Sequence, residues 1–300
     1  MKAFLFSFFM LATLAADSAS EKLAKNLDAA IAKTISEFSQ KQLKREEIAV
    51  TFYDLTTGPV RTASHRGDVR IYPASVVKLF YLEAAHRWME EGKIPDTSEL
   101  RRAMRDMIVE SSNDATHYVI DAITGTTSGP ELPATEMADW ENKRNAINRY
   151  FQSRGYTNIN VNQKPWCEGP FGRERLFVGE KYANRNALTT DTTARLLGEI
   201  ALGNAVSKKR SGEMMDLLQR DPFAKSTDPD DQAHGFSGSA LPPGAKLWSK
   251  AGWTSETRHD AAYIELPNGK KLILVIFTMN HANEREIIPA LVKRILSGLE

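Results

Sequence analysis

The chain has 300 residues, 42% of them hydrophobic, which is enough to bury a substantial core in one large domain or two lobes. Its 39 basic and 38 acidic residues give a formal net charge of +1, so nothing in the charge balance points to nucleic acid or to a charged membrane surface. We therefore expect no nucleic-acid partner. Cys167 is the only cysteine, which excludes an intramolecular disulfide.

The N-terminus carries a targeting pattern. Lys2 precedes an apolar run over residues 3–16, and small residues follow around Ala16 to Ser20. This order is typical of a secretory signal peptide, and the apolar run is short for a membrane span. We expect residues 1–20 to be a signal peptide and the mature protein to be periplasmic or extracellular, without a stable membrane span. An uncleaved N-terminal anchor is the alternative.

The first predicted elements are a helix and a hairpin. Residues 21–44 carry apolar side chains three or four positions apart, the period of an amphipathic helix. Residues 48–55 alternate and are rich in strand-forming types, and a turn signal over 56–59 precedes a possible returning strand over 60–65.

The middle of the chain is predicted to be helical. Residues 156–188 interrupt it as a long segment rich in Gly, Pro, Asn and charged residues, and loops of this length in compact domains are usually functional. The predicted helices cover 75–91, 97–109, 115–123, 138–154, 190–202 and 208–220.

The last part of the chain reads as strands and a closing helix. A surface loop is expected over 232–244. Three strands follow, over 246–250, 259–266 and 271–279, with a hairpin turn at 267–270 and a helix over 282–299.

These elements predict an α+β fold. Its five strands form one antiparallel sheet flanked by the terminal helices, and the central helices form an all-α lobe. We expect the α/β lobe to comprise about 21–70 and 221–300, and the helical lobe about 71–220.

Ser75 and Lys78 lie three residues apart at the start of the helix predicted over 75–91. Positions i and i+3 share a helix face, so the two side chains point the same way. A serine hydroxyl is a weak nucleophile until a nearby base takes its proton, and a lysine with a lowered pKa can be that base. Alone, the pair is a weak signal.

Two further motifs supply the rest of a site. Ser111 and Asn113 lie in a loop between two predicted helices, and the run from Lys250 to Thr254 ends a predicted strand. An attacking serine, a basic lysine, a second serine that carries protons and a backbone pocket for an oxyanion form a consistent set for acyl transfer on an amide, lactam or ester.

With these motifs the chain resembles the serine β-lactamase and penicillin-binding-protein superfamily, most closely its class A-like branch. The resemblance covers essentially all of the mature chain. It implies that Ser75 is the acylated nucleophile, that Lys78 accepts its proton, and that Ser111 relays a proton to the leaving nitrogen.

The resemblance also implies substrate contacts. Asn113 would hold the amide side chain of the substrate, and Lys250 would attract a substrate carboxylate and support the neutral form of Lys78. The backbone N–H groups of Ser75 and Trp253 would form the oxyanion hole. Ala251, Gly252 and Thr254 share that strand end and are expected to contact substrate.

The chain departs from the family pattern at the strand and in one spacing. Ser112 stands where the family has Asp, and Ala251 lacks the hydroxyl that helps to bind a carboxylate. Thr254 is a candidate replacement for that hydroxyl, and Arg258 is a candidate cation for the same group; an exposed strand-edge arginine is the alternative for Arg258. The separation of 111 − 75 = 36 residues is shorter than in typical class A enzymes.

The long segment lacks the family's Glu-x-x-Leu-Asn sequence, whose glutamate activates the deacylating water. Glu168 and Glu174 are the nearest candidates for that base. A salt bridge of Glu174 with Arg173, Arg175 or Arg185 is the alternative. Without a positioned base the acyl-enzyme would turn over slowly.

The resemblance therefore implies a monomeric exported serine hydrolase acting on a small molecule, a β-lactam or a cell-wall peptide, and foremost a β-lactamase. A D-alanyl peptidase or esterase on the same site, or a non-enzymatic binding module, are the alternatives. The histidines are scattered without metal-ligand spacing, so we expect no metal and no cofactor.

Overall fold

The computed structural model describes residues 18–166 and 168–299. Most of the predicted signal peptide, residues 1–17, lies outside these ranges, as does Cys167. The described chain begins in helix α1 (Ser18–Glu37). Within the described ranges, no helix combines the length and apolarity that a membrane crossing requires.

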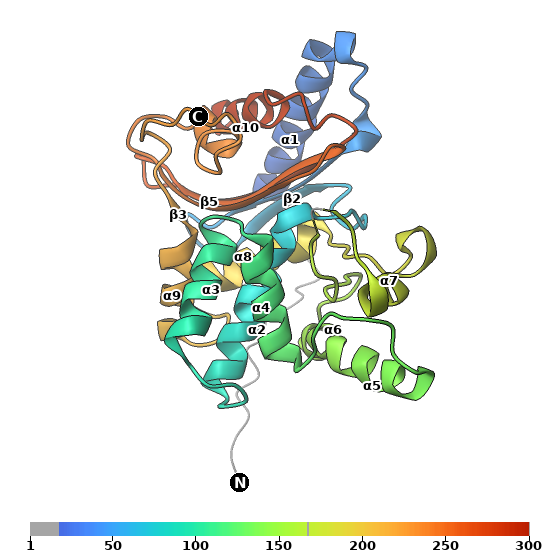
Figure 1. Ribbon diagram of the computed structural model, residues 1–300. Helices are drawn as coiled ribbons and strands as arrows, with labels where there is room; N and C mark the ends of the chain where they lie inside the picture. The colour runs from blue at the N-terminus through green and yellow to red at the C-terminus, as the bar shows by residue number, and fades with distance from the viewer. Residues whose placement is uncertain (1–17, 167, 300) are drawn as a thin grey trace.

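A six-stranded antiparallel sheet forms the middle layer, with the strand order β2-β1-β6-β5-β4-β3 (Figure 1). The strands are β1 (Ile48–Asp54), β2 (Arg61–His65), β3 (Gln219–Arg220), β4 (Lys246–Trp253), β5 (Thr257–Glu265) and β6 (Lys271–Met279). The predicted α+β fold with its antiparallel sheet is confirmed, but the predicted count of five strands is wrong by one. The sixth strand is β3, because the helix predicted over 208–220 ends at Leu218 and the next two residues pair with β4.

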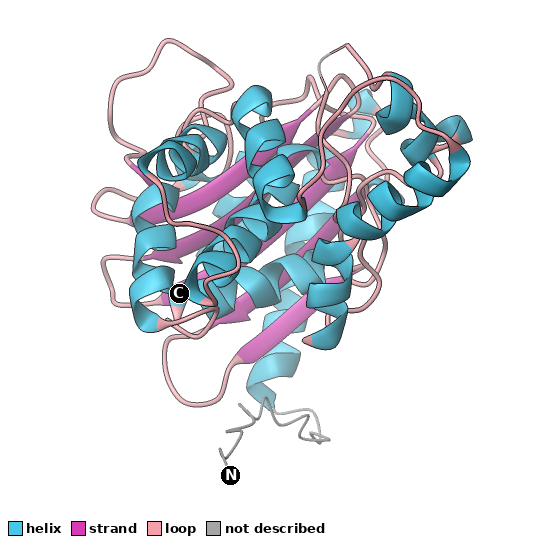
Figure 2. Cartoon of the chain, turned by 60° about the horizontal axis from the view of Figure 1, so that its bottom comes forward, coloured by secondary structure: helices cyan, strands magenta, loops and turns pink. Residues whose placement is uncertain are grey.

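The sheet is apolar on both faces because neighbouring residues of a strand point to opposite sides. On one face, Val50 and Ile276 pack with α1 and α10 (Ile287–Ser297). On the other, Ala49 and Val275 pack with the central helices. Helices lie over the sheet in Figure 2. The central helix α2 (Lys78–Glu90) packs on this second face of the sheet.

The central helices surround α2, which is buried along nearly its whole length. The single helix predicted over 138–154 is two helices, because Asn145 leaves the helical conformation between them. The helices are α2 (Lys78–Glu90), α3 (Ser98–Ile108), α4 (Asn113–Thr124), α5 (Ala134–Arg144), α6 (Ala146–Ser153), α7 (Gly172–Val178), α8 (Thr190–Ala201) and α9 (Lys208–Leu218). Short 3₁₀ turns are η1 (Ser39–Lys41), η2 (Arg45–Glu47), η3 (Ala74–Val77), η4 (Glu180–Tyr182) and η5 (Ser237–Ala240).

The two predicted lobes share one core. Helix α8, which falls inside the predicted helical lobe, packs directly on β1, β5 and β6. The lobe boundaries stay a prediction.

Buried amide side chains hold the segment 156–188 in place, and it contains α7 and η4. The side-chain oxygen of Asn186 accepts hydrogen bonds from the backbone N–H groups of Asn162 (3.0 Å) and Gln163 (2.9 Å). The Tyr81 hydroxyl on α2 lies 2.7 Å from the Gln163 carbonyl oxygen. These contacts tie the segment to the central helix beside the site.

Candidate active site

Ser75 lies in η3, directly before the central helix. The backbone N–H of Lys78 bonds to the Ser75 carbonyl oxygen, so the two residues are joined by a 3₁₀ turn rather than by the α-helical turn that was predicted. In a 3₁₀ turn, residues i and i+3 are eclipsed, which keeps both side chains on one side. Ser75 is partly exposed, whereas Lys78 is fully buried.

The Ser111 side chain lies between two lysines. The Lys78 Nζ donates to the Ser111 carbonyl oxygen (2.6 Å) and to Asn113 Oδ1 (2.9 Å), and it lies 3.2 Å from Ser111 Oγ. The Nζ of Lys250, on strand β4, reaches the same Oγ at 3.0 Å. One hydroxyl is thus in contact with two amine groups that come from a helix and a strand.

The loop that carries Ser111 is fixed by the start of α4. The Ser112 hydroxyl accepts a hydrogen bond from the Ala115 N–H (3.1 Å) and caps this helix. Serine and aspartate are both favoured N-cap residues, so the departure from the family's aspartate at Ser112 keeps the cap.

Two residues of the site adopt a left-handed backbone conformation that is uncommon outside glycine. They are Ala74, with φ of 46°, and Ser111, with φ of 55°. Such conformations cost about 1–3 kcal/mol each and cluster at functional sites, where the surrounding structure holds them.

Strand β4 presents a free edge beside Ser75. The Thr254 N–H bonds to β5, whereas the Ala251 N–H bonds to Gln232 on the opposite side. Since N–H directions alternate along a strand, the N–H of Trp253 also points to the free edge. A Cβ added to Gly252 would lie only 2.6 Å from the Ser75 backbone nitrogen, so η3 and β4 can meet this closely only at a glycine.

Two basic side chains, those of Lys78 and Arg220, act on Lys250 behind this edge. Burial lowers the pKa of Lys250 well below its usual value, and the nearby Lys78 and Arg220 lower it further, whereas Asp260 opposes them. Arg220 donates to the carbonyl oxygens of Ile108 (2.9 Å) and Ser249 (3.2 Å), which places its guanidinium between α3 and β4.

The two suggested substitutes for the missing hydroxyl at Ala251 are engaged elsewhere. The Thr254 hydroxyl accepts hydrogen bonds from the N–H groups of Glu256 (3.1 Å) and Thr257 (3.2 Å) in the β4–β5 turn. Arg258 is 2% exposed and donates to Asp230 Oδ1 at 2.8 Å. The alternative of an exposed strand-edge arginine is therefore wrong, because Arg258 is buried in an ion pair.

The two candidate deacylation bases lie in different settings. Glu168 is exposed. Glu174 is fully buried and accepts two hydrogen bonds from Arg144, each 2.8 Å long. The expected partners of Glu174 were Arg173, Arg175 or Arg185; the observed partner comes from α5. Burial alone would raise the pKa of Glu174, but the hydrogen bonds from Arg144 and Ser128 bring it below its usual value.

An apolar stretch of the long segment packs against α4, one turn beyond Asn113. The His117 Nε2 lies 2.6 Å from the Pro165 carbonyl oxygen, and the His117 ring contacts the Trp166 ring with centroids 4.3 Å apart. This contact holds Pro165 and Trp166 against His117 of α4, four positions along the chain from Asn113.

The structure thus joins Lys78, Ser111, Asn113 and Lys250 and sets Gly252 against Ser75. Sequence reasoning missed Gln232 and Arg220. The former falls in the expected surface loop over 232–244 but is only 8% exposed. No periodic signal marks either side chain, since each is defined by long-range hydrogen bonds.

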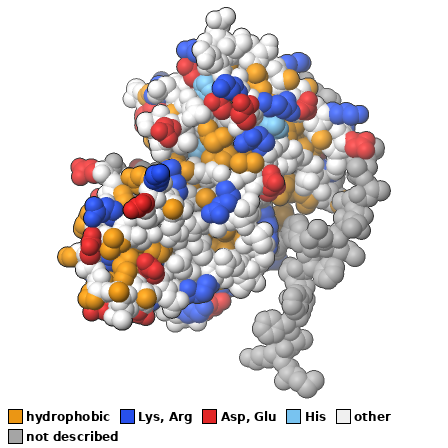
Figure 3. Space-filling model, turned by 90° about the vertical axis from the view of Figure 1, so that its right-hand side faces the viewer, with side chains coloured by type: hydrophobic (Ala, Val, Ile, Leu, Met, Phe, Trp, Pro, Cys, Tyr) orange, Lys and Arg blue, Asp and Glu red, His pale blue; other side chains and the backbone are white. Residues whose placement is uncertain are grey.

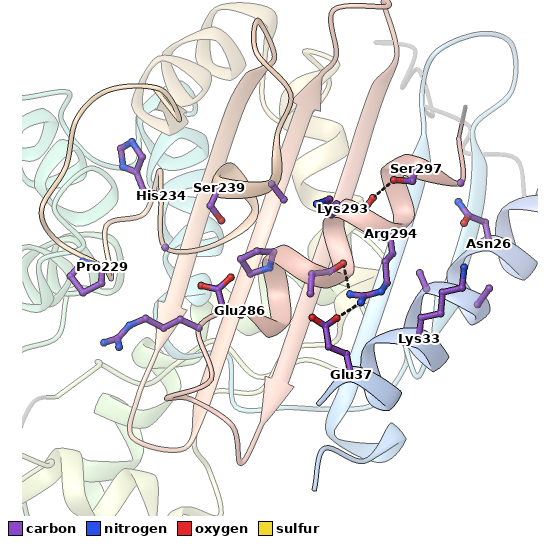
Figure 4. Close-up of a pocket in the computed structure, with 18 residues that line it drawn as sticks. Asn26, Lys33, Glu37, Pro229, His234, Ser239, Glu286, Lys293, Arg294 and Ser297 are labelled. Carbon is purple, nitrogen blue, oxygen red and sulfur yellow. Dashed lines mark hydrogen bonds and ion pairs between the residues drawn. The ribbon is translucent and has the colours of Figure 1, made fainter. Parts of the chain in front are cut away.

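The molecular surface is also hollowed away from this site. A hollow of about 1020 Å³ lies between α1, α10 and the loop that contains Pro229 and His234 (Figure 4). Its lining includes none of the predicted catalytic residues. Acidic and basic side chains are intermixed on the face drawn in Figure 3. Among the described residues, no group of three or more His, Cys, Asp or Glu could hold a metal ion.

The antiparallel sheet between terminal and central helices, with a serine and a lysine at the start of the central helix, defines a fold of the serine β-lactamase and penicillin-binding-protein type. The chain belongs to the beta-lactamase enzyme family, which matches residues 26–297. The predicted resemblance is confirmed.

Solved structures share this fold. A β-lactamase from Sphaerobacter thermophilus has a TM-score of 0.64 and 20% identity, over 91% of this chain and 96% of that one. A single-residue variant of PBP-A, solved as an acyl-enzyme complex with penicillin G, has a TM-score of 0.65 and 18% identity, over 92% and 96%. A class A β-lactamase from Bacteroides cellulosilyticus has a TM-score of 0.63 and 15% identity, over 92% and 98%. No curated protein matches the chain.

Proposed function

We propose that the chain is an exported serine hydrolase that forms an acyl-enzyme at Ser75 with a β-lactam. The observation that carries this proposal is the Ser111 hydroxyl, which lies 3.2 Å from the Lys78 Nζ and 3.0 Å from the Lys250 Nζ beside the turn that carries Ser75. A proton can pass along such a chain of contacts, since each is within hydrogen-bond reach.

The proposed reaction begins with attack of Ser75 Oγ on the lactam carbonyl carbon. The hydroxyl proton passes to the neutral amine of Lys78, and the N–H groups of Ser75 and Trp253 stabilise the oxyanion. The carbonyl carbon–nitrogen bond then breaks, and the nitrogen receives a proton through Ser111. The product is a ring-opened ester on Ser75.

Release of the acyl group is proposed to be the slow step. Water must attack the ester and return a proton to Ser75, which needs a general base within reach. The candidate Glu174 is anionic but bound to Arg144, and Glu168 is exposed. We therefore expect the acyl-enzyme to accumulate.

A chromogenic cephalosporin tests this proposal. The mature protein should give a rapid burst of ring opening of about one equivalent, followed by slow turnover, and Ser75→Ala should give neither. Ser297→Ala, an exposed serine on α10, is the matched control and should behave as the wild type. Absence of both a burst and a covalent adduct in the wild type would contradict the β-lactam proposal.

A D-alanyl peptidase is the second candidate. The missing hydroxyl at Ala251 and the pairing of the candidate base Glu174 with Arg144 favour it, because both weaken the case for efficient lactam hydrolysis. Release of D-alanine from a peptidoglycan stem peptide, lost in Ser75→Ala, would support it. Failure of every acylating probe to label the folded protein would instead favour a non-enzymatic binding module.

A further inference from the structure

Gln232 has a fully satisfied side chain although it lies in an irregular stretch between β3 and η5. Its side-chain amide forms two hydrogen bonds through each end. An amide group has two donors and one oxygen with two lone pairs, so four bonds are its full capacity. Buried polar groups that are saturated in this way fix a local structure rigidly.

The oxygen end of the amide holds strand β4. Gln232 Oε1 accepts from the Lys250 Nζ at 2.5 Å and from the Ala251 N–H at 3.3 Å. The same Nζ also donates to the Ala251 carbonyl oxygen at 2.7 Å and contacts Ser111 Oγ at 3.0 Å. Three oxygen atoms therefore match the three N–H bonds of an ammonium group and define where it points.

The nitrogen end holds the last turn of α3. Gln232 Nε2 donates to the carbonyl oxygens of Val109 (2.9 Å) and Ile108 (3.2 Å). The final carbonyl groups of a helix lack intrahelical partners, and a side-chain donor can satisfy them. Because Ser111 follows Val109 by two residues, one side chain links Lys250 to the loop that carries Ser111.

We propose that Gln232 is a positioning residue for acylation at Ser75, whose amide sets the Lys250 ammonium against the Ser111 hydroxyl. The inference rests on the proposed function, since it concerns the proton path of that reaction. Proton transfer needs heavy atoms about 2.6–3.2 Å apart, and the side chain that joins the strand to the loop controls this distance.

The neutral amide also adds no charge beside Lys250. The groups that act on Lys250 are Lys78 from α2, Arg220 from β3 and Asp260 from β5. Burial lowers the pKa of Arg220, and the carboxylates of Asp260, Asp231 and Glu110 oppose this shift. A carboxylate at position 232 would add an anion in direct contact with the ammonium and raise its pKa.

Two variants separate positioning from stability. Gln232→Met keeps the length of the side chain and removes its hydrogen bonds; Gln232→Glu keeps its shape and adds a charge. Gln163→Met is the control, because it removes another buried amide, which lies in the segment 156–188. The second-order rate of Ser75 labelling by a fluorescent penicillin is measured across pH, together with thermal unfolding.

Gln232→Met is expected to lose about tenfold or more of the labelling rate. In Gln232→Glu the alkaline limb of the rate profile should move to higher pH, because the ammonium keeps its proton longer. Gln163→Met should melt earlier and keep both the rate and the limb.

Wild-type rates and an unmoved alkaline limb in both Gln232 variants would overturn the inference and leave acylation standing. Because Gln232→Glu preserves the volume of the side chain, it remains a test if Gln232→Met does not fold. An unlabelled wild type would overturn the proposed function itself, and this is established before any variant is compared.

Discussion

At the scale of single residues, the site depends on hydroxyl and amine groups that meet within hydrogen-bond distance. Ser111 and Ser112 are neighbours with different partners: the former contacts two lysines, and the latter caps α4. Their roles can therefore be separated by removing one hydroxyl group at a time, with a serine-to-alanine change at each position.

Ser111→Ala should slow acylation by about a hundredfold or more, because the proton path to the leaving nitrogen is lost. Ser112→Ala should instead cost about 1 kcal/mol of unfolding free energy through the lost cap, and label at the wild-type rate when folded. Labelling kinetics and denaturant unfolding of both variants check this. Equal labelling rates for the two variants would contradict the relay role of Ser111.

Gly252 is the residue whose lack of a side chain is most directly required. A methyl group there would lie 2.6 Å from the Ser75 backbone nitrogen. A backbone atom cannot rotate away from such a contact as a side chain can. We expect Gly252→Ala to displace the Ser75 N–H and reduce acylation about a hundredfold, as for loss of one oxyanion-hole donor. Gly212→Ala on α9, where nothing lies within 4 Å, is the control and should label normally.

At the scale of elements, a buried ion pair holds two helices together. Glu174 on α7 and Arg144 on α5 are both fully buried and bonded to each other. Removing one partner of such a pair leaves an uncompensated charge. Glu174→Gln should therefore cost about 3 kcal/mol of unfolding free energy and leave the deacylation rate of the folded protein unchanged.

The control for this variant is Arg175→Gln, which breaks an exposed pair with Glu131 and should change stability by less than about 1 kcal/mol. Deacylation is followed by the loss of the penicillin label over time. A label that persists far longer in Glu174→Gln than in the wild type would identify Glu174 as the base after all.

A second buried carboxylate, Glu83 on α2, contacts α6 through the Tyr150 hydroxyl, which donates to it at 2.6 Å. Burial raises the pKa of Glu83 from 4.5 to about 7. Between these values the folded protein binds more protons than the unfolded chain, so this group makes stability fall as pH rises. Glu83→Gln, which mimics the protonated acid, should flatten this slope in thermal melts over that pH range.

An exposed carboxylate provides the comparison for Glu83. Glu99 on α3 pairs with Arg102 at the surface, so Glu99→Gln should keep the wild-type slope. Identical pH slopes for Glu83→Gln and the wild type would contradict the protonated state of Glu83 in the folded protein.

At the scale of the whole molecule, the site is the meeting point of the sheet and the central helices. Ser75 and Lys78 come from the start of the central helix, Ser111 from the joint between α3 and α4, and Lys250 from β4. Sequence patterns predicted these elements because each has a clear period or a turn signal. The family motifs then indicated which of their ends should meet.

The features that could not be predicted from the sequence are those formed by contacts between residues far apart in the chain. Strand β3 has two residues, too few for an alternation to be read, and exists through pairing with β4. Glu174 has arginines beside it in sequence but bonds to Arg144, thirty positions away. Gln232 lies in a stretch without periodicity, and only folding brings it to Lys250.

The central claim is that Ser75 becomes acylated. Intact-protein mass spectrometry after incubation with penicillin G, followed by peptide mapping, tests it most directly. We expect one penicillin-derived adduct per chain, located on Ser75, long-lived and absent from Ser75→Ala. An unmodified wild-type protein that is folded by its thermal melt, or an adduct that persists in Ser75→Ala, would contradict it.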